Sequence, residues 1–363
     1  MGDDRGKKAG DPAGGAGPIL AIESSCDETA CAVLDRSGAI LSERVLSQQE
    51  HLPFGGVVPE IAARAHLAHL PVLAATALAD AGVAAGDLGA VAASTGPGLI
   101  GGLIVGSHFA KGLALSLGVP FVAVNHLEAH ALTARLPGLV PDGAPFPYLL
   151  LLVSGGHCQC VAVDGLGRYR RLGGTIDDAA GEAFDKVAKM LGLGWPGGPA
   201  LERLARDGDP AVHPLPRPLL GRPGCDFSFS GLKTAVAQRI AALPRDAEGV
   251  IRRQDAADLA AAFQRSVSLV LADRVAHALA MMPDATLLVV AGGVAANAEI
   301  RANLLGLATE RGIGFAAPPL RLCTDNAVMV GWAALERLRA GLAGRNGLDT
   351  PPRPRWPLDE LAA

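Results

Sequence analysis

Hydrophobic and polar positions follow one pattern twice along this chain. Each copy has an apolar run that ends at a polar turn and is followed by two further strand-like segments, at residues 19–23, 30–35 and 39–47 in the first copy and at 148–153, 158–163 and 168–172 in the second. Short apolar runs bounded by polar and glycine-rich residues are typical of strands. The repetition predicts two structurally duplicated halves, each built on a three-stranded meander.

After each meander the apolar period becomes helical. A helix opened by a proline is predicted over residues 59–80, with Ile61, Ala65, Ala68 and Val72 on one side. Further apolar runs predict buried strands and one long alanine-rich helix, at residues 88–94, 120–124 and 286–291 for the strands and 254–282 for the helix. Strands that alternate with helices indicate the α/β class.

Two predicted strands end in glycine-rich turns at a helix start, at residues 95–102 and 292–297. Such a turn presents backbone N–H groups at a helix N-terminus, which favours anions. The glycines of the first turn could equally serve close helix packing, and no Gly-Lys-Ser/Thr follows them as in a Walker loop. The second turn suits a nucleotide, with Asn297 one turn into the helix and bonded to the polar edge of the ligand.

Composition bounds the size and partners of the protein. The 363 residues suggest two domains or lobes, and the hydrophobic content of 50% with 4% aromatic residues predicts a large aliphatic core. The net charge of −4 requires any basic patch for nucleic acid to be local.

The six cysteines form no CxxC pair and are expected to be reduced thiols. No apolar run reaches the roughly 20 residues of a membrane helix, and residues 1–17 are expected to be a disordered tail without a secretory signal.

Two histidines, His126 and His130, stand four residues apart just after the predicted strand at 120–124. Residues with this spacing lie on one face of a helix, so a metal could bind both imidazoles, with a third ligand from elsewhere and an open position for substrate. The alternative is an ordinary polar helix face. Glu128 follows His126 by two residues, about 200° around the helix axis, so it does not match the glutamate of a zinc-protease motif.

Acidic residues gather at two further places. Asp27 and Glu28 lie in the polar turn after the first strand, where they suit a phosphate or its metal. An ordinary hairpin turn is the alternative, but two consecutive acidic residues are costly to place there without a use. Asp177 and Asp178 stand at favourable capping positions for the helix that follows them, and Asp178 shares a helix face with Glu182 and Asp185. Capping does not explain Asp185, which falls in the middle of the predicted helix.

The duplicated meander-plus-helices lobes resemble a two-lobed α/β fold of the actin/sugar-kinase/Hsp70 type, which has a nucleotide and metal site between its lobes. The expected division is a disordered tail, a first lobe completed by a C-terminal helix, a second lobe and an extended tail, at residues 1–17, 18–135 with about 325–345, 145–323 and 346–363. This fold alone suggests a kinase or an ATPase. The imidazole ligands favour Fe²⁺ or Zn²⁺ instead of the Mg²⁺ of such enzymes.

Nine segments match one family in order, at residues 23–28, 55–60, 95–99, 126–130, 153–157, 177–186, 226–234, 292–297 and 323–326. From about Ile19 to the C-terminus the chain resembles the bacterial TsaD (Gcp/YgjD) family of tRNA N6-adenosine threonylcarbamoyltransferases. The resemblance implies transfer of the threonylcarbamoyl group from threonylcarbamoyl-AMP to the exocyclic amine of adenosine 37, in tRNAs reading codons that begin with adenine. The products are N6-threonylcarbamoyladenosine and AMP.

The resemblance also implies ligands, partners and a compartment. The metal ligands are His126, His130 and Asp325, with Fe²⁺ expected and Zn²⁺ as the alternative. The substrate-binding residues are Leu152, Val153, Ser154, Gly155, Gly156, Asp185, Gly198 and Asn297, with Glu202 matching only some relatives. The partners are tRNA, a smaller paralogous TsaB-like subunit and a small TsaE-like ATPase, in the cytoplasm and without a membrane.

Two residues depart from the family pattern. Many relatives have His where this chain has Asn125, whose side chain is not expected to share the face of His126 and His130. Ser24 replaces a frequent Thr and keeps the hydroxyl group. Asp27 or Glu28 is the hypothetical acceptor of the amine proton. Arg353 and Arg355 are candidate contacts to tRNA.

Three other functions remain alternatives. A metalloprotease would use the histidine pair for peptide hydrolysis, and a sugar-kinase-like phosphotransferase would move phosphate from ATP to a small hydroxyl compound. A non-catalytic paralogous scaffold subunit would not be expected to keep His126, His130, Asp325 and Asn297 together.

Overall fold

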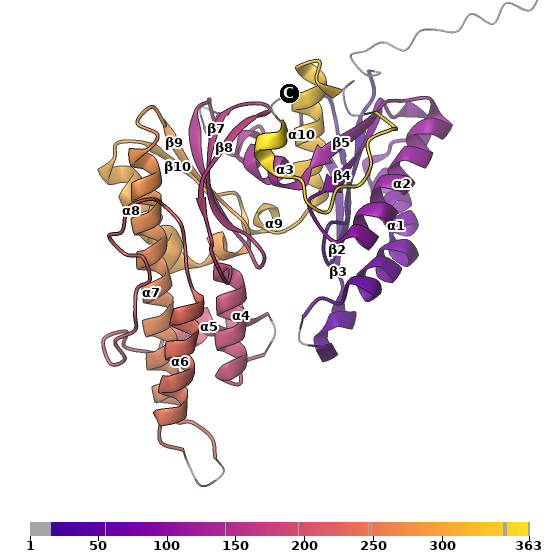
Figure 1. The fold of residues 1–363 in the computed structure, drawn as a ribbon. Coiled ribbons are helices and arrows are strands. Elements are labelled where there is room, and N and C mark those ends of the chain that lie inside the picture. Colours follow the sequence, from indigo (N-terminus) through magenta and orange to yellow (C-terminus); the bar gives the residue numbers. More distant parts are fainter. Residues whose placement is uncertain are drawn as a thin grey trace, which may run out of the picture. The chain divides into compact units, whose positions relative to one another are not determined.

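The computed structural model describes residues 16–54, 56–141, 143–194, 196–245, 247, 249–343 and 347–361. The predicted tail at residues 1–17 therefore lies outside the described residues except for its last two. The chain divides into two compact units (Figure 1). Unit 1 comprises Met1–Pro137 with Asp325–Glu360, and unit 2 comprises Gly138–Thr324 with Leu361–Ala363.

Unit 1 is a five-stranded sheet with helices on both faces. Its strands are β1 (Ile19–Glu23), β2 (Glu28–Leu34), β3 (Ile40–Ser47), β4 (Ala90–Gly96) and β5 (Phe121–Asn125), in the order β3-β2-β1-β4-β5. The first three strands pair antiparallel as the predicted meander, whereas β4 and β5 run parallel to β1. The helices are α1 (Pro59–Ala81), α2 (Ile100–Leu117), α3 (His126–Leu132) and α10 (Ala327–Arg339).

Unit 2 repeats this topology, which confirms the predicted duplication. Its strands are β6 (Tyr148–Val153), β7 (Cys158–Gly165), β8 (Arg168–Gly174), β9 (Leu287–Ala291) and β10 (Gly314–Ala316), in the order β10-β9-β6-β7-β8. Its helices are α4 (Ala180–Met190), α5 (Gly197–Ala205), α6 (Ser230–Ala242), α7 (Arg253–Ala280), α8 (Ala298–Glu310) and α9 (Leu320–Cys323). Short 3₁₀ turns lie at Gln49–Phe54, Ala85–Asp87, Thr133–Arg135, Gly293–Ala296 and Leu358–Leu361.

The alternation of side chains along β1 decides what each face of the unit 1 sheet holds. Leu20 and Ile22 pack in the core under α1 and α2. Ala21 points to the opposite face, where it lies against Gly331 of α10. Because side chains alternate along a strand, Glu23 at the end of β1 also points to the α10 face. The strand thereby delivers a fully buried carboxylate near the start of α10.

The predicted buried face of α1 is wrong in part. Ala65 is buried as expected, but Ala68 and Val72 are exposed, and the core face instead carries Leu70 and Ala74. Alanines occur all around this helix, so its apolar period is shallow and does not define the face sharply. By length and composition alone, α1 and α2 are long and apolar enough to cross a membrane. In this structure both pack on the sheet of unit 1.

The glycine turn at residues 95–102 packs closely against the end of β1. A methyl group on Gly98 would lie 2.6 Å from the carbonyl oxygen of Ser25, and one on Gly102 would lie 2.3 Å from that of Ser24. The amide of Leu99 also donates to Ser25 O at 2.7 Å. Of the two uses that the sequence left open, the structure therefore shows close packing of α2 against residues 24 and 25.

Candidate functional site

Helix α3 starts at the residue that follows β5, and Asn125 makes this abrupt change of direction stable. The Asn125 Oδ1 atom accepts hydrogen bonds from Leu127 N at 2.8 Å and Glu128 N at 3.2 Å, as an N-cap does. His126 and His130 then lie one turn apart, and both are buried. The prediction that the Asn125 side chain does not share the histidine face is confirmed.

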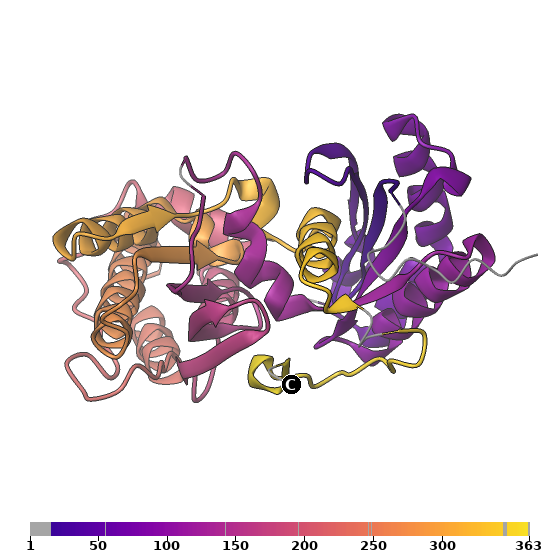
Figure 2. The ribbon, with the colours of Figure 1, turned by 90° about the horizontal axis from the view of Figure 1, so that it is seen from above.

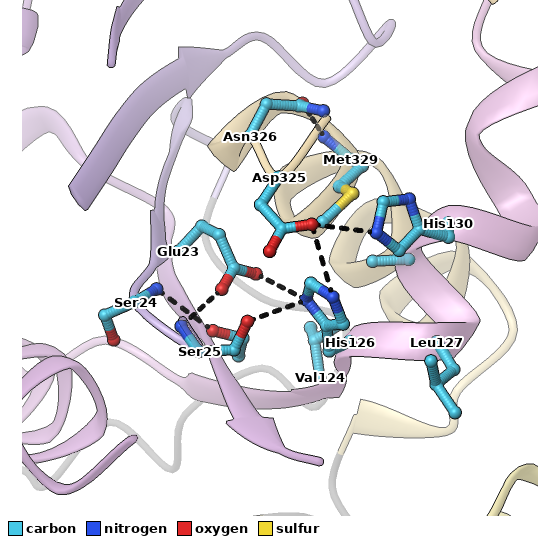
Figure 3. A network of polar contacts seen from close by, with 12 residues as sticks. Glu23, Ser24, Ser25, Val124, His126, Leu127, His130, Asp325, Asn326 and Met329 are labelled. Atoms are coloured by element: carbon cyan, nitrogen blue, oxygen red, sulfur yellow. Dashed lines mark hydrogen bonds and ion pairs between the residues drawn. The ribbon is translucent and has the colours of Figure 1, made fainter. Parts of the chain in front are cut away.

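Asp325 brings a carboxylate to the two imidazoles from a distant part of the chain (Figure 3). It directly precedes Asn326, which caps α10 by accepting from Met329 N at 2.9 Å. Asp325 Oδ1 lies 3.1 Å from His130 Nε2 and 3.5 Å from His126 Nε2. The ligand atoms of the three residues lie within 4.8 Å of one another, and no other His/Cys/Asp/Glu group in the described part of the chain is as suited to a metal ion.

Two further side chains, Glu23 and Ser25, hold the other side of the His126 ring, and sequence reasoning assigned them no role. His126 Nδ1 lies 3.0 Å from Glu23 Oε2 and 3.1 Å from Ser25 Oγ (Figure 3). Glu23 Oε1 in turn accepts from Ser25 N at 2.6 Å. These contacts leave His126 Nε2 directed at Asp325. The sequence feature that could have indicated this role is Glu23 itself, a charged residue at the end of an otherwise apolar strand.

Electrostatics couple these groups. Burial by itself raises the pKa of Glu23, but His126 and the bonds from His126 and Ser25 outweigh it and hold that pKa below its usual value. Burial lowers the pKa of His126, whereas the carboxylates of Asp325 and Glu23 more than offset it and raise that pKa to about 9. In the metal-free protein a proton on His126 therefore balances the buried carboxylates.

The residues fit a divalent metal. Two imidazole nitrogens and one carboxylate oxygen converge on one point, and such N/O donor sets bind transition metals. The contact of His126 Nδ1 with Glu23 is the outer-shell arrangement that orients a metal-binding histidine. Glu128 is not part of this group, because its carboxylate forms a buried ion pair with Arg337 at 2.8 Å. This arrangement agrees with the prediction that Glu128 points away from the histidine face.

Asp27 and Glu28 lie next to the metal group in unit 1. Both side chains are half-buried, and Glu28 forms the first residue of β2 instead of part of the preceding turn. Burial, together with the nearby Asp325 and Asp27, raises the pKa of Glu28 to about 9.

The predicted substrate-binding residues all belong to unit 2, and the first group of them ends β6. Leu152 and Val153 are fully buried, Ser154 is half-buried, and Gly155 and Gly156 are exposed. Ser154 closes the turn to β7, since its amide donates to His157 O at 2.7 Å and its Oγ accepts from His157 N at 3.0 Å. Its carbonyl oxygen accepts from Gly181 N at 3.2 Å, which brings α4 to this strand end.

The remaining predicted residues lie at or bind to the starts of two helices, α5 and α8. Asp185 on α4 accepts from Gly197 N at 3.1 Å, next to Gly198 at the start of α5. Burial raises the pKa of Asp185, although bonds from the Gly197 and Gly198 amides oppose this shift. Glu202 on α5 accepts from Ala298 N of α8 at 3.0 Å. Asp185 therefore binds the start of α5, which explains its position in the middle of α4.

Asn297 is the N-cap of α8 and does not lie one turn into the helix, which corrects the sequence prediction. Its Oδ1 accepts from Ile300 N at 3.1 Å and its Nδ2 donates to Gln264 Oε1 at 2.8 Å. The short 3₁₀ turn that follows Gly292 displaces the start of α8 to Ala298. Both ends of the Asn297 carboxamide therefore bind protein groups in this structure.

The prediction that Asp178 caps its own helix is also wrong. Helix α4 begins at Ala180, and no side chain caps it. Asp178 instead pairs with Lys186 and Lys233. The neighbouring Asp177 accepts from Phe229 N at 2.8 Å and thereby holds the start of α6.

Comparisons with known proteins add a family to this geometry. Residues 39–332 match the family model described as TsaD, tRNA N6-adenosine threonylcarbamoyltransferase. The chain is 65% identical over 344 residues to the protein of that name from Gluconobacter oxydans (strain 621H), with 94% of each chain covered. It is 62% identical over 352 residues to the protein of the same name from Granulibacter bethesdensis, again with 94% of each covered.

Solved structures show the fold. The HypF protein of T. kodakarensis aligns with a TM-score of 0.59 and 14% identity, covering 89% of this chain and 48% of HypF. Component A of the (R)-2-hydroxyglutaryl-CoA dehydratase of Acidaminococcus fermentans aligns with a TM-score of 0.51 and 16% identity, covering 89% and 98%. These similarities confirm the predicted actin/sugar-kinase/Hsp70-like fold.

Replacing Glu23 by Gln should weaken metal binding by roughly tenfold, because outer-shell partners of metal-binding histidines typically contribute at least that much. A Gln side chain keeps the volume but has only one oxygen for the two contacts that Glu23 makes. Titration of metal-free protein with Co²⁺, followed by visible absorbance, measures the dissociation constant. Glu60→Gln, at an exposed ion pair on α1, is the control. Equal affinity in Glu23→Gln and wild type would contradict this role.

Proposed function

The chain belongs to the TsaD family of tRNA N6-adenosine threonylcarbamoyltransferases, and from this premise we propose which of its residues perform the transfer. As a family member the chain is an acyltransferase. It moves the threonylcarbamoyl group from threonylcarbamoyl-AMP to the exocyclic amine of adenosine 37 in tRNA. The observation that carries this assignment is high identity to relatives of that name over nearly the whole chain.

We assign the metal centre to His126, His130 and Asp325. When bound there, a divalent ion would orient an oxygen of the threonylcarbamoyl group and withdraw charge from the reacting carbon. Glu23 and Ser25 fix the ring of His126, so that Nε2 is presented as the ligand atom. Two imidazoles and one carboxylate are the donor set of non-haem Fe²⁺ sites and also of catalytic Zn²⁺ sites. We propose Fe²⁺, with Zn²⁺ as the alternative.

We assign adenylate binding to unit 2. The exposed Gly155 and Gly156 leave the backbone at the end of β6 open to a ligand. Asp185 and Asn297 each bind a backbone amide at the start of α5 or α8, and Gly198 lies at the start of α5. The adenosine amine attacks the carbamoyl carbon, the bond from that carbon to the AMP phosphate oxygen breaks, and AMP leaves. No covalent enzyme intermediate is required.

The acceptor of the amine proton is proposed to be Asp27 or Glu28. Glu28 lies close to Asp325, which belongs to the proposed metal centre, and Asp27 is its neighbour in the chain.

The alternatives receive less support from the geometry. A metalloprotease needs a carboxylate at the metal-bound water, but the carboxylate of Glu128 is paired with Arg337. A scaffold subunit has no need of three convergent ligands that a buried Glu23 orients. For tRNA contacts, Arg353 is engaged by Glu360 and by the ring of Trp356, whereas Arg355 is exposed and remains a candidate.

We propose that the outer face of α1 and α2 binds the smaller paralogous subunit. Large apolar side chains are exposed along both helices, namely Leu67, Val72, Ile104 and Leu115. Exposed apolar patches of this kind mark protein or membrane contacts. The opposite sides of both helices pack on the sheet of unit 1, so the two helices belong to the folded unit. For an enzyme expected in the cytoplasm, this favours a protein over a membrane as the partner of the exposed face. A small ATPase that supports turnover completes the proposed set of partners.

Replacing His126 by Ala should abolish transfer, because a ligand of the proposed metal is lost. The measurement is incorporation of labelled threonylcarbamoyl into unmodified tRNA, with the partner proteins present. His277→Ala, on α7 of unit 2, is the control and should retain activity. Equal transfer by His126→Ala and wild type would reduce the histidines to a structural role, and no transfer by wild type would support the scaffold alternative.

Asp27→Ala should slow transfer by about 100-fold or more, as expected for loss of a general base. Glu28→Ala should show this loss instead if Glu28 is the acceptor. Binding of the metal and of a non-hydrolysable adenylate analogue, measured by calorimetry, should remain close to wild type in both. Normal transfer by both variants would refute a role for the acidic turn in proton removal.

The double variant Leu67→Glu/Ile104→Glu should lose binding of the paralogous subunit while keeping the wild-type unfolding temperature, because both side chains are exposed. Size-exclusion chromatography of the mixed proteins measures complex formation. Val212→Glu, an equally exposed apolar position in unit 2, should bind as wild type does. A double variant that still forms the complex would exclude this face.

A further inference from the structure

A C-terminal segment of unit 1 lies across the ends of β4 and β5, next to the helix that carries the two histidines. We call residues 350–360 the C-terminal strap; it is part of the yellow chain in Figures 1 and 2. Its backbone pairs with the turn after β4, since Arg353 N donates to Thr95 O at 2.7 Å and Pro354 O accepts from Gly98 N at 3.1 Å. A methyl group on Gly96 would lie 1.9 Å from Arg353 O, so the strap lies directly on this backbone.

The strap also reaches the start of the helix that carries both histidines. Trp356 is almost fully buried, and its carbonyl oxygen accepts a hydrogen bond from Asn125 Nδ2 at 2.8 Å. The Oδ1 atom of the same carboxamide caps α3 by accepting from Leu127 N and Glu128 N. One fully buried side chain therefore joins the strap to the first turn of α3, where His126 is the first residue.

The strap supports a second contact of His126. The turn that the strap covers continues into Leu99, whose amide donates to Ser25 O. Ser25 Oγ lies 3.1 Å from His126 Nδ1. The strap therefore contacts the surroundings of His126 by two routes. Through Asn125 it reaches the backbone of the first turn of α3, and through the turn after β4 it reaches Ser25, which holds the His126 ring.

From this geometry we infer that the C-terminal strap positions the metal-binding helix, and that Asn125 is the positioning residue that couples the two. The inference rests on the proposed metal centre of His126, His130 and Asp325. By linkage, a strap that favours metal binding is itself held more tightly when the metal is bound.

The Asn125→Asp variant separates the two functions of the carboxamide. An Asp side chain keeps an acceptor for the amides of Leu127 and Glu128, and Asp is as good an N-cap as Asn. It offers no donor at neutral pH to Trp356 O, so the cap remains while the bond to the strap is lost. Asn303→Asp, the same chemical change in unit 2, is the matched control, where only the bond to Ser268 is affected.

Two measurements on the full chain test the inference. Titration of the metal-free proteins with Co²⁺ should give a dissociation constant about tenfold higher for Asn125→Asp than for wild type and Asn303→Asp. Limited trypsin digestion reports on the strap, because Arg355 is exposed whereas Trp356 after it is buried, so cleavage between them requires release of the strap. Mass spectrometry of the released C-terminal peptide should show faster cleavage in Asn125→Asp. Co²⁺ should slow the cleavage in wild type and in Asn303→Asp but not in Asn125→Asp.

The outcomes separate the two proposals. Faster cleavage of Asn125→Asp with unchanged Co²⁺ affinity would overturn the coupling, and unchanged cleavage would overturn the role of Asn125 in holding the strap. If His126→Ala binds Co²⁺ as tightly as wild type, the proposed metal centre fails instead. The metal-free digestion still decides whether Asn125 holds the strap in that case.

Discussion

The buried carboxylate of Glu23 is the constraint on which the arrangement of unit 1 depends. An unpaired charge in a protein interior costs several kcal/mol, so the surrounding structure must supply partners for it. Here the partners are the His126 ring and the amide of Ser25. The end of β1, the start of α3 and Asp325, which precedes the N-cap of α10, therefore hold one another in place. The imidazole that faces Asp325 is oriented before any ligand arrives.

Unit 2 uses its polar residues differently. Asp185, Glu202 and Asn297 each bind the amide of a helix start, so two helix N-termini are held close together within this unit. The partial positive charge of helix N-termini makes such a place favourable for a phosphate group. The acidic side chains next to it act chiefly as braces for the helices, while the glycines at the end of β6 remain free of close neighbours.

Much of the architecture was predictable from the sequence because it is local. The strands of both meanders, the duplication and the start of α1 after Val58 follow from periodicity and turn residues. The wrong predictions concern contacts between distant segments. Asp177 binds the start of α6, some fifty residues away, and Asp178 pairs with Lys233 of α6. The roles of Glu23 and of the C-terminal strap were missed for the same reason. No spacing rule relates Asn125 to Trp356, and only the folded chain brings them together.

Two ion pairs join α3 and the 3₁₀ turn that follows it to α10, and they have a consequence for how this sequence can diverge. Glu128 pairs with Arg337, and Arg135 pairs with Glu336, with Glu128 fully buried. Removing one member of a buried pair costs about 3–5 kcal/mol, whereas replacing both by apolar residues can be nearly neutral. Substitutions at positions 128 and 337 are therefore tolerated jointly and selected against singly, so descendants of this chain should change these two positions together or keep both.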